Sequence, residues 1–141
     1  TQIVVYALIV SGLYQLLLVL AQHGFVSIAP ETLSVFEQIA LFSGAEVLIG
    51  GSGAAFTNLA FCSPGCRVVI LAKYPLQASF FTAYARHVGT DLAYLTEKDG
   101  GVDGMEDLHE AFEVDTLRLD AMLTQMDAAL VRRDTDGGQT A

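Results

Sequence analysis

The sequence predicts an α/β fold: a three-layer αβα, Rossmann-like domain in which helices cover both faces of a mostly parallel sheet of about five strands. Short apolar stretches rich in β-branched residues alternate with stretches of helical spacing along most of the chain. Such alternation is typical of parallel strands joined by crossover helices. The chain has 141 residues, of which 52% are hydrophobic and 16% charged, so it can bury one substantial core but hardly two.

The expected strands are short apolar segments at residues 2–7, 25–29, 46–50, 67–72 and 92–96. The expected helices alternate with them at residues 13–22, 34–43, 54–61 and 76–89, and a last one starts at residue 115. Capping residues mark several helix ends. Ser34 and Glu37 have the spacing of a capping box, and Asp115 is placed to cap the last helix. Three glycines are placed to end helices: Gly24, Gly44 and Gly89.

The N-terminal segment has two interpretations. Residues 3–21 contain no charged side chain, which also fits a transmembrane helix. However, Gly12, Tyr14 and Gln15 interrupt the apolar run, and no Lys or Arg flanks it. We therefore expect a buried parallel strand followed by a helix.

One domain is expected over residues 1–131. Within it, residues 97–110 are acidic and rich in glycine, so they are expected to form a loop outside the core. Residues 132–141 are expected to form a flexible tail.

Charge and cysteine content limit the kinds of partner. Sixteen acidic residues against seven basic ones give a net charge of −9, and without a basic stripe the chain is not expected to bind nucleic acid. Cys62 and Cys66 are too few for a zinc site, so no metal is expected and two buried thiols are favoured over a disulfide. His23 is expected to stabilise the C-terminal end of its helix through the helix dipole.

The segment from Gly50 to Asn58 is the main candidate for a ligand site. Gly50, Gly51 and Gly53 lie between an expected strand and an expected helix, at the carboxyl end of the strand, where ligands bind in parallel sheets. Backbone amides at the start of a helix can hold a phosphate there without Lys or Arg. A tight turn that uses glycine only for packing explains the same spacing, and both interpretations stay open.

Two common phosphate motifs are missing from this segment. The dinucleotide fingerprint requires a third glycine, where Phe56 stands, and an acidic residue about 20 positions further on, where residues 70–73 have none. The P-loop requires Gly-Lys-Ser/Thr after the turn. An NAD-dependent oxidoreductase and a P-loop nucleotidase are therefore disfavoured.

Several residues of the region 33–71 fit a known family signature: Glu37, Gln38, Gly50, Gly53, Ala54, Thr57, Asn58, Pro64 and Gly65. On these residues the chain resembles the family 61 glycosyltransferases of the capsular-polysaccharide type. Residues 109–115 are similar to the C-terminal segment of that family, and the resemblance covers most of residues 24–130.

The resemblance implies a two-lobed glycosyltransferase of the GT-B type, of which this chain is the C-terminal, donor-binding lobe. Such an enzyme transfers a sugar from a nucleotide sugar, here expected to be a UDP-sugar, to a glycan acceptor, with inversion and without a bound metal or other cofactor. It needs an N-terminal lobe or a partner chain that supplies one. Its expected setting is surface polysaccharide biosynthesis in the cytoplasm, with peripheral membrane association left open.

The resemblance places the donor phosphates at the glycine turn, with the residues Gly50, Gly51, Ser52, Gly53, Ala54, Thr57 and Asn58. Glu37 is a further candidate that its capping box also explains. Lys73, just past a strand end, either pairs with a phosphate or is solvated.

Two positions depart from the family signature. Ser52 replaces a histidine, and a serine cannot carry charge at neutral pH. Ile70 replaces a glutamate in the following strand. No catalytic residue is therefore assigned, and a non-catalytic α/β module for binding or assembly is the alternative to an active enzyme.

Overall fold

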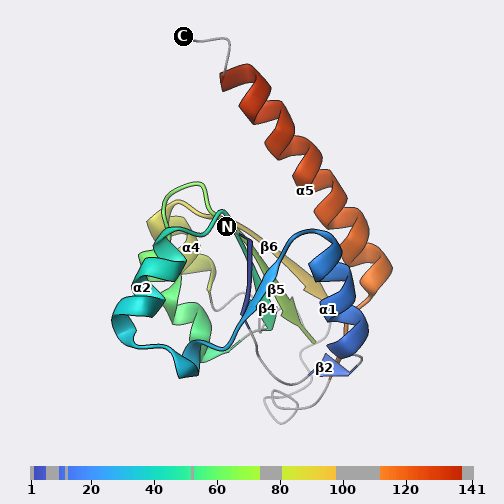
Figure 1. The fold of residues 1–141 in the computed structure, drawn as a ribbon, viewed down its shortest axis with the longest axis horizontal. Coiled ribbons are helices and arrows are strands. Elements are labelled where there is room, and N and C mark those ends of the chain that lie inside the picture. Colours follow the sequence, from blue (N-terminus) through green and yellow to red (C-terminus); the bar gives the residue numbers. More distant parts are fainter. Residues whose placement is uncertain are drawn as a thin grey trace.

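The computed structural model describes residues 2–5, 10–11, 13–51, 53–73, 81–97 and 112–137. They form a mixed α/β structure in which helices flank a parallel sheet (Figure 1). The sheet has five strands in the order β3-β1-β4-β5-β6, and every neighbouring pair is parallel. Their bounds are β1 Gln2–Val5, β3 Val26–Ile28, β4 Val47–Gly51, β5 Arg67–Ala72 and β6 Asp91–Thr96. The predicted parallel sheet of about five strands is confirmed.

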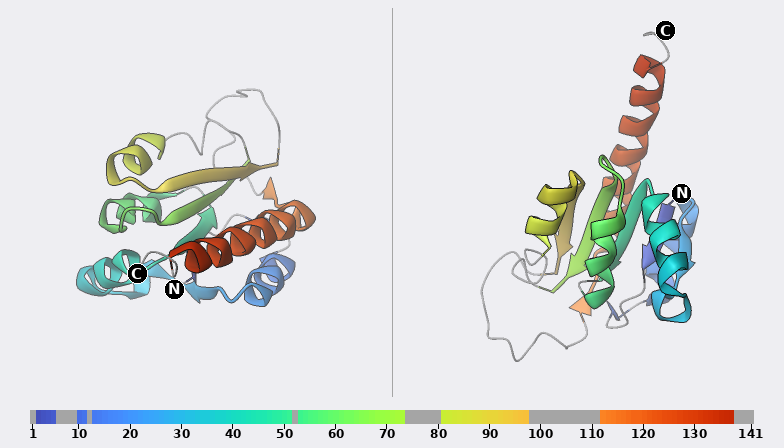
Figure 2. Two further views of the ribbon diagram at one scale, coloured as in Figure 1. Left: turned by 90° about the horizontal axis from the view of Figure 1, so that it is seen from above. Right: turned by 90° about the vertical axis from the view of Figure 1, so that its left-hand side faces the viewer.

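Helices cover both faces of the sheet (Figure 2). On one face lie α1 (Leu13–Gln22) and α5 (Thr116–Gly137), which contact each other. On the other face lie α2 (Val35–Ser43), the 3₁₀ helix η2 (Ala54–Phe61) and α4 (Thr82–Val88). A short 3₁₀ turn, η1 (Pro30–Thr32), precedes α2.

The two faces of the sheet contribute to separate hydrophobic cores because side chains alternate along each strand. From β5, Val68 and Ile70 pack towards α2, η2 and α4, whereas Val69 and Leu71 pack towards α1 and α5. All four side chains are at most 2% exposed. A strand buried on both faces has the continuous apolar sequence that predicted it.

The N-terminal segment forms a strand and then a helix, as expected. β1 and α1 are separate elements, and no helix within the described part of the chain is both long and apolar enough to cross a membrane. A second, two-stranded parallel sheet of β2 (Val10–Ser11) and β7 (Phe112–Glu113) was not predicted. Both strands have two residues, too few for a periodic sequence pattern.

The predicted helix ends are confirmed by their geometry. Ser34 and Glu37 form the capping box, and Gly24 and Gly89 have left-handed backbones with φ of 79° and 83°. Gly44 also ends its helix, but with φ −90°. Asp115 caps α5, since its Oδ1 accepts hydrogen bonds of 3.1 Å from the amides of residues 117 and 118.

One element differs in length from the expectation, and two expected segments lie partly outside the residues that the structure describes. α5 continues through Gly137 and so includes part of the expected tail, residues 132–137. Residues 98–110 of the expected acidic loop lie outside the described residues, as do residues 76–80 of the expected fourth helix. Ser52, one of the predicted site residues, also lies outside them.

Candidate functional site

The strand order favours a ligand position at the carboxyl ends of β1 and β4. Counted along the chain, the five strands lie in the order second, first, third, fourth, fifth, so the order reverses between β1 and β4. In sheets of this order, ligands bind outside the carboxyl ends of the strands at the reversal. β4 ends there in Gly50 and Gly51, and Gly50 lies opposite Val5 of β1.

The glycines at this position are strand residues as well as turn residues. Gly50 and Gly51 are buried at the end of β4, and they pair with Ile70 and Leu71 of β5. Gly53 precedes η2 with φ −179° and ψ 174°, an extended backbone that any residue adopts. Conformation alone therefore does not require glycine at position 53, and a side chain can be introduced there without backbone strain.

The first amides of η2 are the backbone donors at this end of the sheet. The first hydrogen bond of the helix runs from the amide of Phe56 to the carbonyl of Gly53, at 3.0 Å. The amides of Ala54 and Ala55 come before that bond and have no acceptor within the helix. An anion site at the glycine turn would depend on these donors.

Phe56 holds η2 against the sheet. Its side chain is fully buried, and its ring centroid lies 5.6 Å from that of Phe81, which precedes α4. This is the position where a dinucleotide fingerprint has its third glycine. Here the position belongs to the core, which agrees with the rejection of that motif.

Asn58 connects η2 to α2 through its side chain. Its Nδ2 donates a 2.8 Å hydrogen bond to Oε1 of Gln38. The Nε2 of Gln38 in turn donates to the carbonyls of Pro30 and Leu33, at 2.9 and 3.1 Å. The hydrogen bonds of Asn58 and Gln38 thus hold η2 in place beside α2.

Two other candidate residues are exposed. Glu37 accepts the amide of Ser34 at 2.7 Å, and this backbone hydrogen bond lowers the pKa of the Glu37 carboxyl. Its capping role is therefore shown. Thr57 lies on the exposed side of η2 and has an interaction partner.

For Lys73, the structure excludes one of the two expected states. Only 7% of its surface is exposed and it has an interaction partner, so the solvated alternative is wrong. The sequence could not indicate this, because the burial follows from the place of Lys73 directly after the inner strand β5 and not from the residue type.

Ile70, where the family signature has a glutamate, is a core residue. It is fully buried in the cluster beneath α2, η2 and α4, where Phe42 and Phe56 also lie. A carboxylate at this position would enter an apolar environment, so the isoleucine fits the packing of this chain.

Cys62 and Cys66 are free thiols, and both are buried, as expected. A hydrogen bond joins the two side chains, and together with burial it raises the pKa of the Cys66 thiol. No group of three or more His, Cys, Asp or Glu that could hold a metal ion is found among the described residues.

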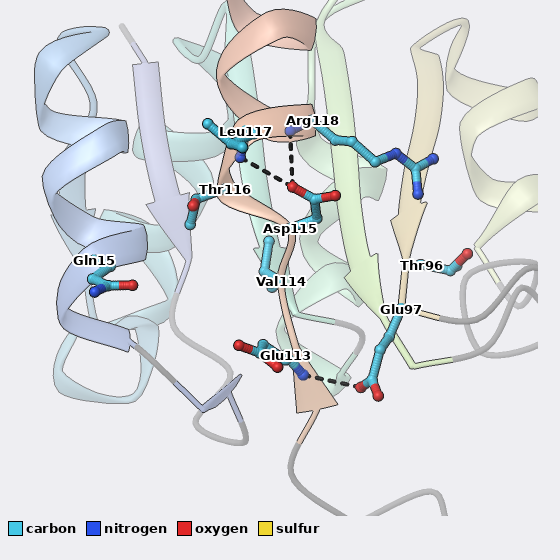
Figure 3. A pocket seen from close by; sticks show the side chains of 9 residues that line it. All are labelled: Gln15, Thr96, Glu97, Glu113, Val114, Asp115, Thr116, Leu117 and Arg118. Carbon is cyan, nitrogen blue, oxygen red and sulfur yellow. Dashed lines mark hydrogen bonds between the residues drawn. The ribbon is translucent and has the colours of Figure 1, made fainter.

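A second candidate site, which the sequence did not indicate, is a pocket at the start of α5 (Figure 3). Its volume is about 390 Å³, within the range of roughly 300–1,000 Å³ for ligand pockets. The lining residues come from α1, the end of β6, β7 and the first turn of α5: Gln15, Thr96, Glu97, Glu113, Val114, Asp115, Thr116, Leu117 and Arg118.

This pocket is at the same edge of the sheet as the glycine turn. Thr96 is the last residue of β6, and it pairs with Ala72 at the end of β5. One wall is held in place by Glu97, whose Oε2 accepts the amide of Glu113 at 2.9 Å. The pocket could not be predicted from the sequence because its walls come from segments far apart in the chain.

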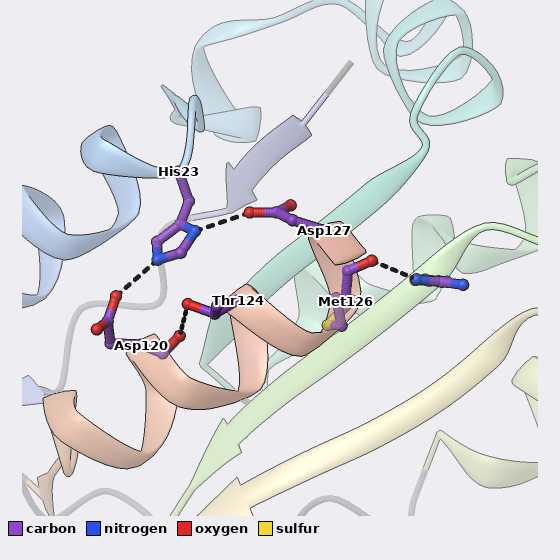
Figure 4. Close-up of polar contacts among 6 residues, drawn as sticks. His23, Asp120, Thr124, Met126 and Asp127 are labelled. Carbon is purple, nitrogen blue, oxygen red and sulfur yellow. Dashed lines mark hydrogen bonds and ion pairs between the residues drawn. The ribbon is translucent and has the colours of Figure 1, made fainter. Parts of the chain in front are cut away.

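On the same face, His23 connects the end of α1 to the middle of α5 (Figure 4). Its Nε2 lies 2.7 Å from Asp120 Oδ1 and its Nδ1 lies 2.9 Å from Asp127 Oδ2. The hydrogen bond with Asp120 and then that with Asp127 raise the pKa of His23. Besides its place at a helix end, His23 therefore has an ionic role between helices.

Comparison with known proteins supports the family resemblance. Residues 10–69 match the family model described as Glycosyltransferase 61. The matched segment contains the glycine turn, η2 and the hydrogen-bonded pair Gln38 and Asn58. The segment at 109–115 lies outside it. No curated protein sequence matches the chain.

Proposed function

We propose that this chain, whose residues 10–69 match the Glycosyltransferase 61 family model, is the donor-binding lobe of a glycosyltransferase and binds a nucleotide sugar at residues 50–58. The observation that carries the proposal is the position of the glycine turn. It leaves the carboxyl end of β4 where the strand order reverses, and a helix starts directly after it. Parallel sheets bind ligands at this position.

The proposed chemistry depends on the backbone. Amides at the start of η2 would donate hydrogen bonds to the diphosphate of a UDP-sugar and stabilise the charge that develops on it as the sugar leaves. Gly51 and Gly53 leave room for the phosphates to approach the main chain. Family resemblance adds inverting transfer without a metal, to a glycan acceptor.

The wider setting of the proposal follows from the family. A GT-B enzyme encloses donor and acceptor between two lobes, so the Rossmann-like domain described here would act with an N-terminal lobe, in the same polypeptide or in a partner chain. We place this activity in surface polysaccharide biosynthesis, in the cytoplasm and with peripheral association with the membrane.

Titration calorimetry with UDP and with UDP-hexoses tests the proposal. The unmodified chain should bind them, and Gly53→Val should lose at least tenfold in affinity, because its side chain would occupy the turn. The extended backbone at position 53 accepts valine, so this variant should remain folded. Gly44→Ala is the matched control, since its new Cβ would lie 3.5 Å from the carbonyl of Ala40, an ordinary contact. Equal affinity of Gly53→Val and the unmodified chain would contradict the proposal.

A non-catalytic binding or assembly module is the second candidate. Ile70 favours it, because this core residue replaces a carboxylate of the family signature. Ser52→His distinguishes the two: a gain in UDP release from a UDP-hexose would favour an enzyme, whereas unchanged donor binding without turnover would favour the module.

A further inference from the structure

We propose that the pocket at the start of α5 is a subsite for a neutral sugar ring, bound through its hydroxyl groups. This inference rests on the proposed function, since it assigns the pocket to the sugar of the donor or of the glycan acceptor. The matched segment 10–69 contributes only Gln15 to the pocket. The other lining residues come from the region 96–118, which includes residues 113–115 of the segment that resembles the C-terminal part of the family.

The pocket is lined by several polar side chains that do not hold the fold together. Within the described residues, no hydrogen bond or ion pair is made by the side chains of Gln15, Thr96, Glu113, Thr116 and Arg118. In Figure 3, Gln15 stands on the α1 side of the pocket, and the guanidinium of Arg118 extends towards the β6 side. The pocket therefore offers donors and acceptors from opposite walls.

The backbone around these groups is fixed by hydrogen bonds. Asp115 holds the first turn of α5, and Glu97 holds the amide of Glu113. Each of these two carboxylates uses one oxygen in its bond to the backbone. These bonds fix the backbone of the wall before a ligand arrives, so only side-chain freedom would be lost there on binding.

The charge of the lining selects against an anionic ligand. The lining contains three carboxylates, those of Glu97, Glu113 and Asp115, and one guanidinium, that of Arg118. Like charges raise the free energy of binding a phosphate or a carboxylate here. Hydroxyl groups, by contrast, donate short, strong hydrogen bonds to carboxylate oxygens, so a neutral polyol is the complementary ligand class.

Apolar surface at the rim completes the site. Leu117 is 82% exposed on the first turn of α5, although it lies beside the polar lining. Val114 is half-buried in the same wall. A sugar ring has C–H faces as well as hydroxyl groups, and it would cover this apolar surface on binding.

The pocket is also at a suitable distance from the glycine turn. β6 is the second neighbour of β4 in the sheet, so their carboxyl ends lie roughly 10 Å apart at the usual spacing between strands. Gly51 pairs with Leu71, and Thr96 pairs with the next residue of β5, Ala72. A diphosphate at the turn and a sugar in the pocket would thus lie side by side.

Amide chemical shifts of the full chain test the inference. The probes are UDP, a UDP-hexose, a set of neutral trisaccharides of glucose, xylose and mannose, and glucuronate. We expect at least one neutral trisaccharide, or the hexose of the UDP-hexose, to shift the amides of Thr96, Glu97 and Thr116. UDP alone should leave these amides unchanged. Shifts with the UDP-hexose only would assign the subsite to the donor, and shifts with a trisaccharide would assign it to the acceptor.

Matched variants make the result specific. Glu113→Gln should weaken saccharide binding by about tenfold, because it removes a charged acceptor. Glu31→Gln, on the exposed turn η1 that follows the opposite edge strand, should not change it. The inference is overturned if no neutral probe shifts the pocket amides, if glucuronate shifts them equally, or if both variants bind alike.

The experiment distinguishes failure of the subsite inference from failure of the proposed function. Gly53→Val should abolish the shifts caused by UDP while leaving the shifts caused by a trisaccharide at Thr96 and Thr116. UDP binding without any saccharide effect would overturn the subsite alone.

Discussion

The side-chain amide of Asn58 donates a 2.8 Å hydrogen bond to the Oε1 of Gln38 and thereby joins η2 to α2. Both residues belong to the segment that matches the glycosyltransferase 61 model. The pair fixes the short 3₁₀ helix that starts at the glycine turn. It connects the packing of the fold to the proposed donor site.

Replacing the donor of this pair should destabilise the protein. In Asn58→Asp, a carboxylate would face the Oε1 of Gln38, so the hydrogen bond would become a repulsion between two acceptors. We expect a loss of about 1–3 kcal/mol in the free energy of unfolding, measured by urea denaturation. Asn58→Ala, which removes the donor without adding a second acceptor, should lose less. Equal stability of Asn58→Asp and the unmodified chain would show that the bond contributes nothing.

The contact of His23 with α5 should make stability depend on pH. Because the pKa of His23 is raised above 6.5 in the folded state, mainly by its hydrogen bond with Asp120, the folded protein binds the proton more tightly than the unfolded chain. The resulting stabilisation is fully present below pH 6.5 and is lost as the pH rises through the raised pKa. Urea denaturation between pH 5.5 and 9 should show this loss. His23→Gln should remove it, and a variant with an unchanged pH dependence would rule out this role.

A carboxylate at position 70 should not be tolerated. Ile70→Glu would place an unpaired charge or a protonated carboxyl in the core, so we expect a loss of at least about 3 kcal/mol in the free energy of unfolding. Ile70→Val is the control and should cost roughly 0.5–1.5 kcal/mol. If Ile70→Glu were as stable as Ile70→Val, polar groups around the site would have to accommodate it. Ser52→His alone is therefore the better test of recovered catalysis.

The two cysteines should react slowly with thiol reagents in the native state. Both are at most 6% exposed, and the raised pKa of Cys66 reduces its reactive thiolate form. Peptide mass spectrometry after brief treatment of the unmodified native protein with a thiol reagent should find Cys66 labelled more slowly than Cys62, because the pair must stay intact for the shift to persist. In urea both should react fully. Rapid labelling of native Cys66 would contradict the buried, hydrogen-bonded thiol.

Local signals in the sequence predicted a large part of the fold. The capping box of Ser34 and Glu37 and the left-handed glycines Gly24 and Gly89 depend on neighbouring residues only, so their sequence spacing was sufficient. Strand β5 was predicted because burial on both faces demands an uninterrupted apolar run. The family signature was recognised because its residues are concentrated within one segment.

Features that depend on distant segments could not be predicted. His23 meets Asp120 and Asp127 across sequence separations of 97 and 104 residues. The pocket at α5 is likewise lined by both Gln15 and Glu113, and only the completed fold brings their elements to one pocket. The burial of Lys73 is a third case, since the residue type alone suggests exposure. Such arrangements arise from strand order, on which local sequence patterns carry no information.

Strand β4 lies in the middle of the sheet, hydrogen-bonded to β1 and β5, with all five of its residues buried. Hydrogen exchange at its amides should consequently need opening of most of the molecule, which makes this strand one of the slowest segments to exchange. The proposed donor site starts at the end of this strand, so little conformational entropy of the strand itself would remain to be lost when a ligand arrives.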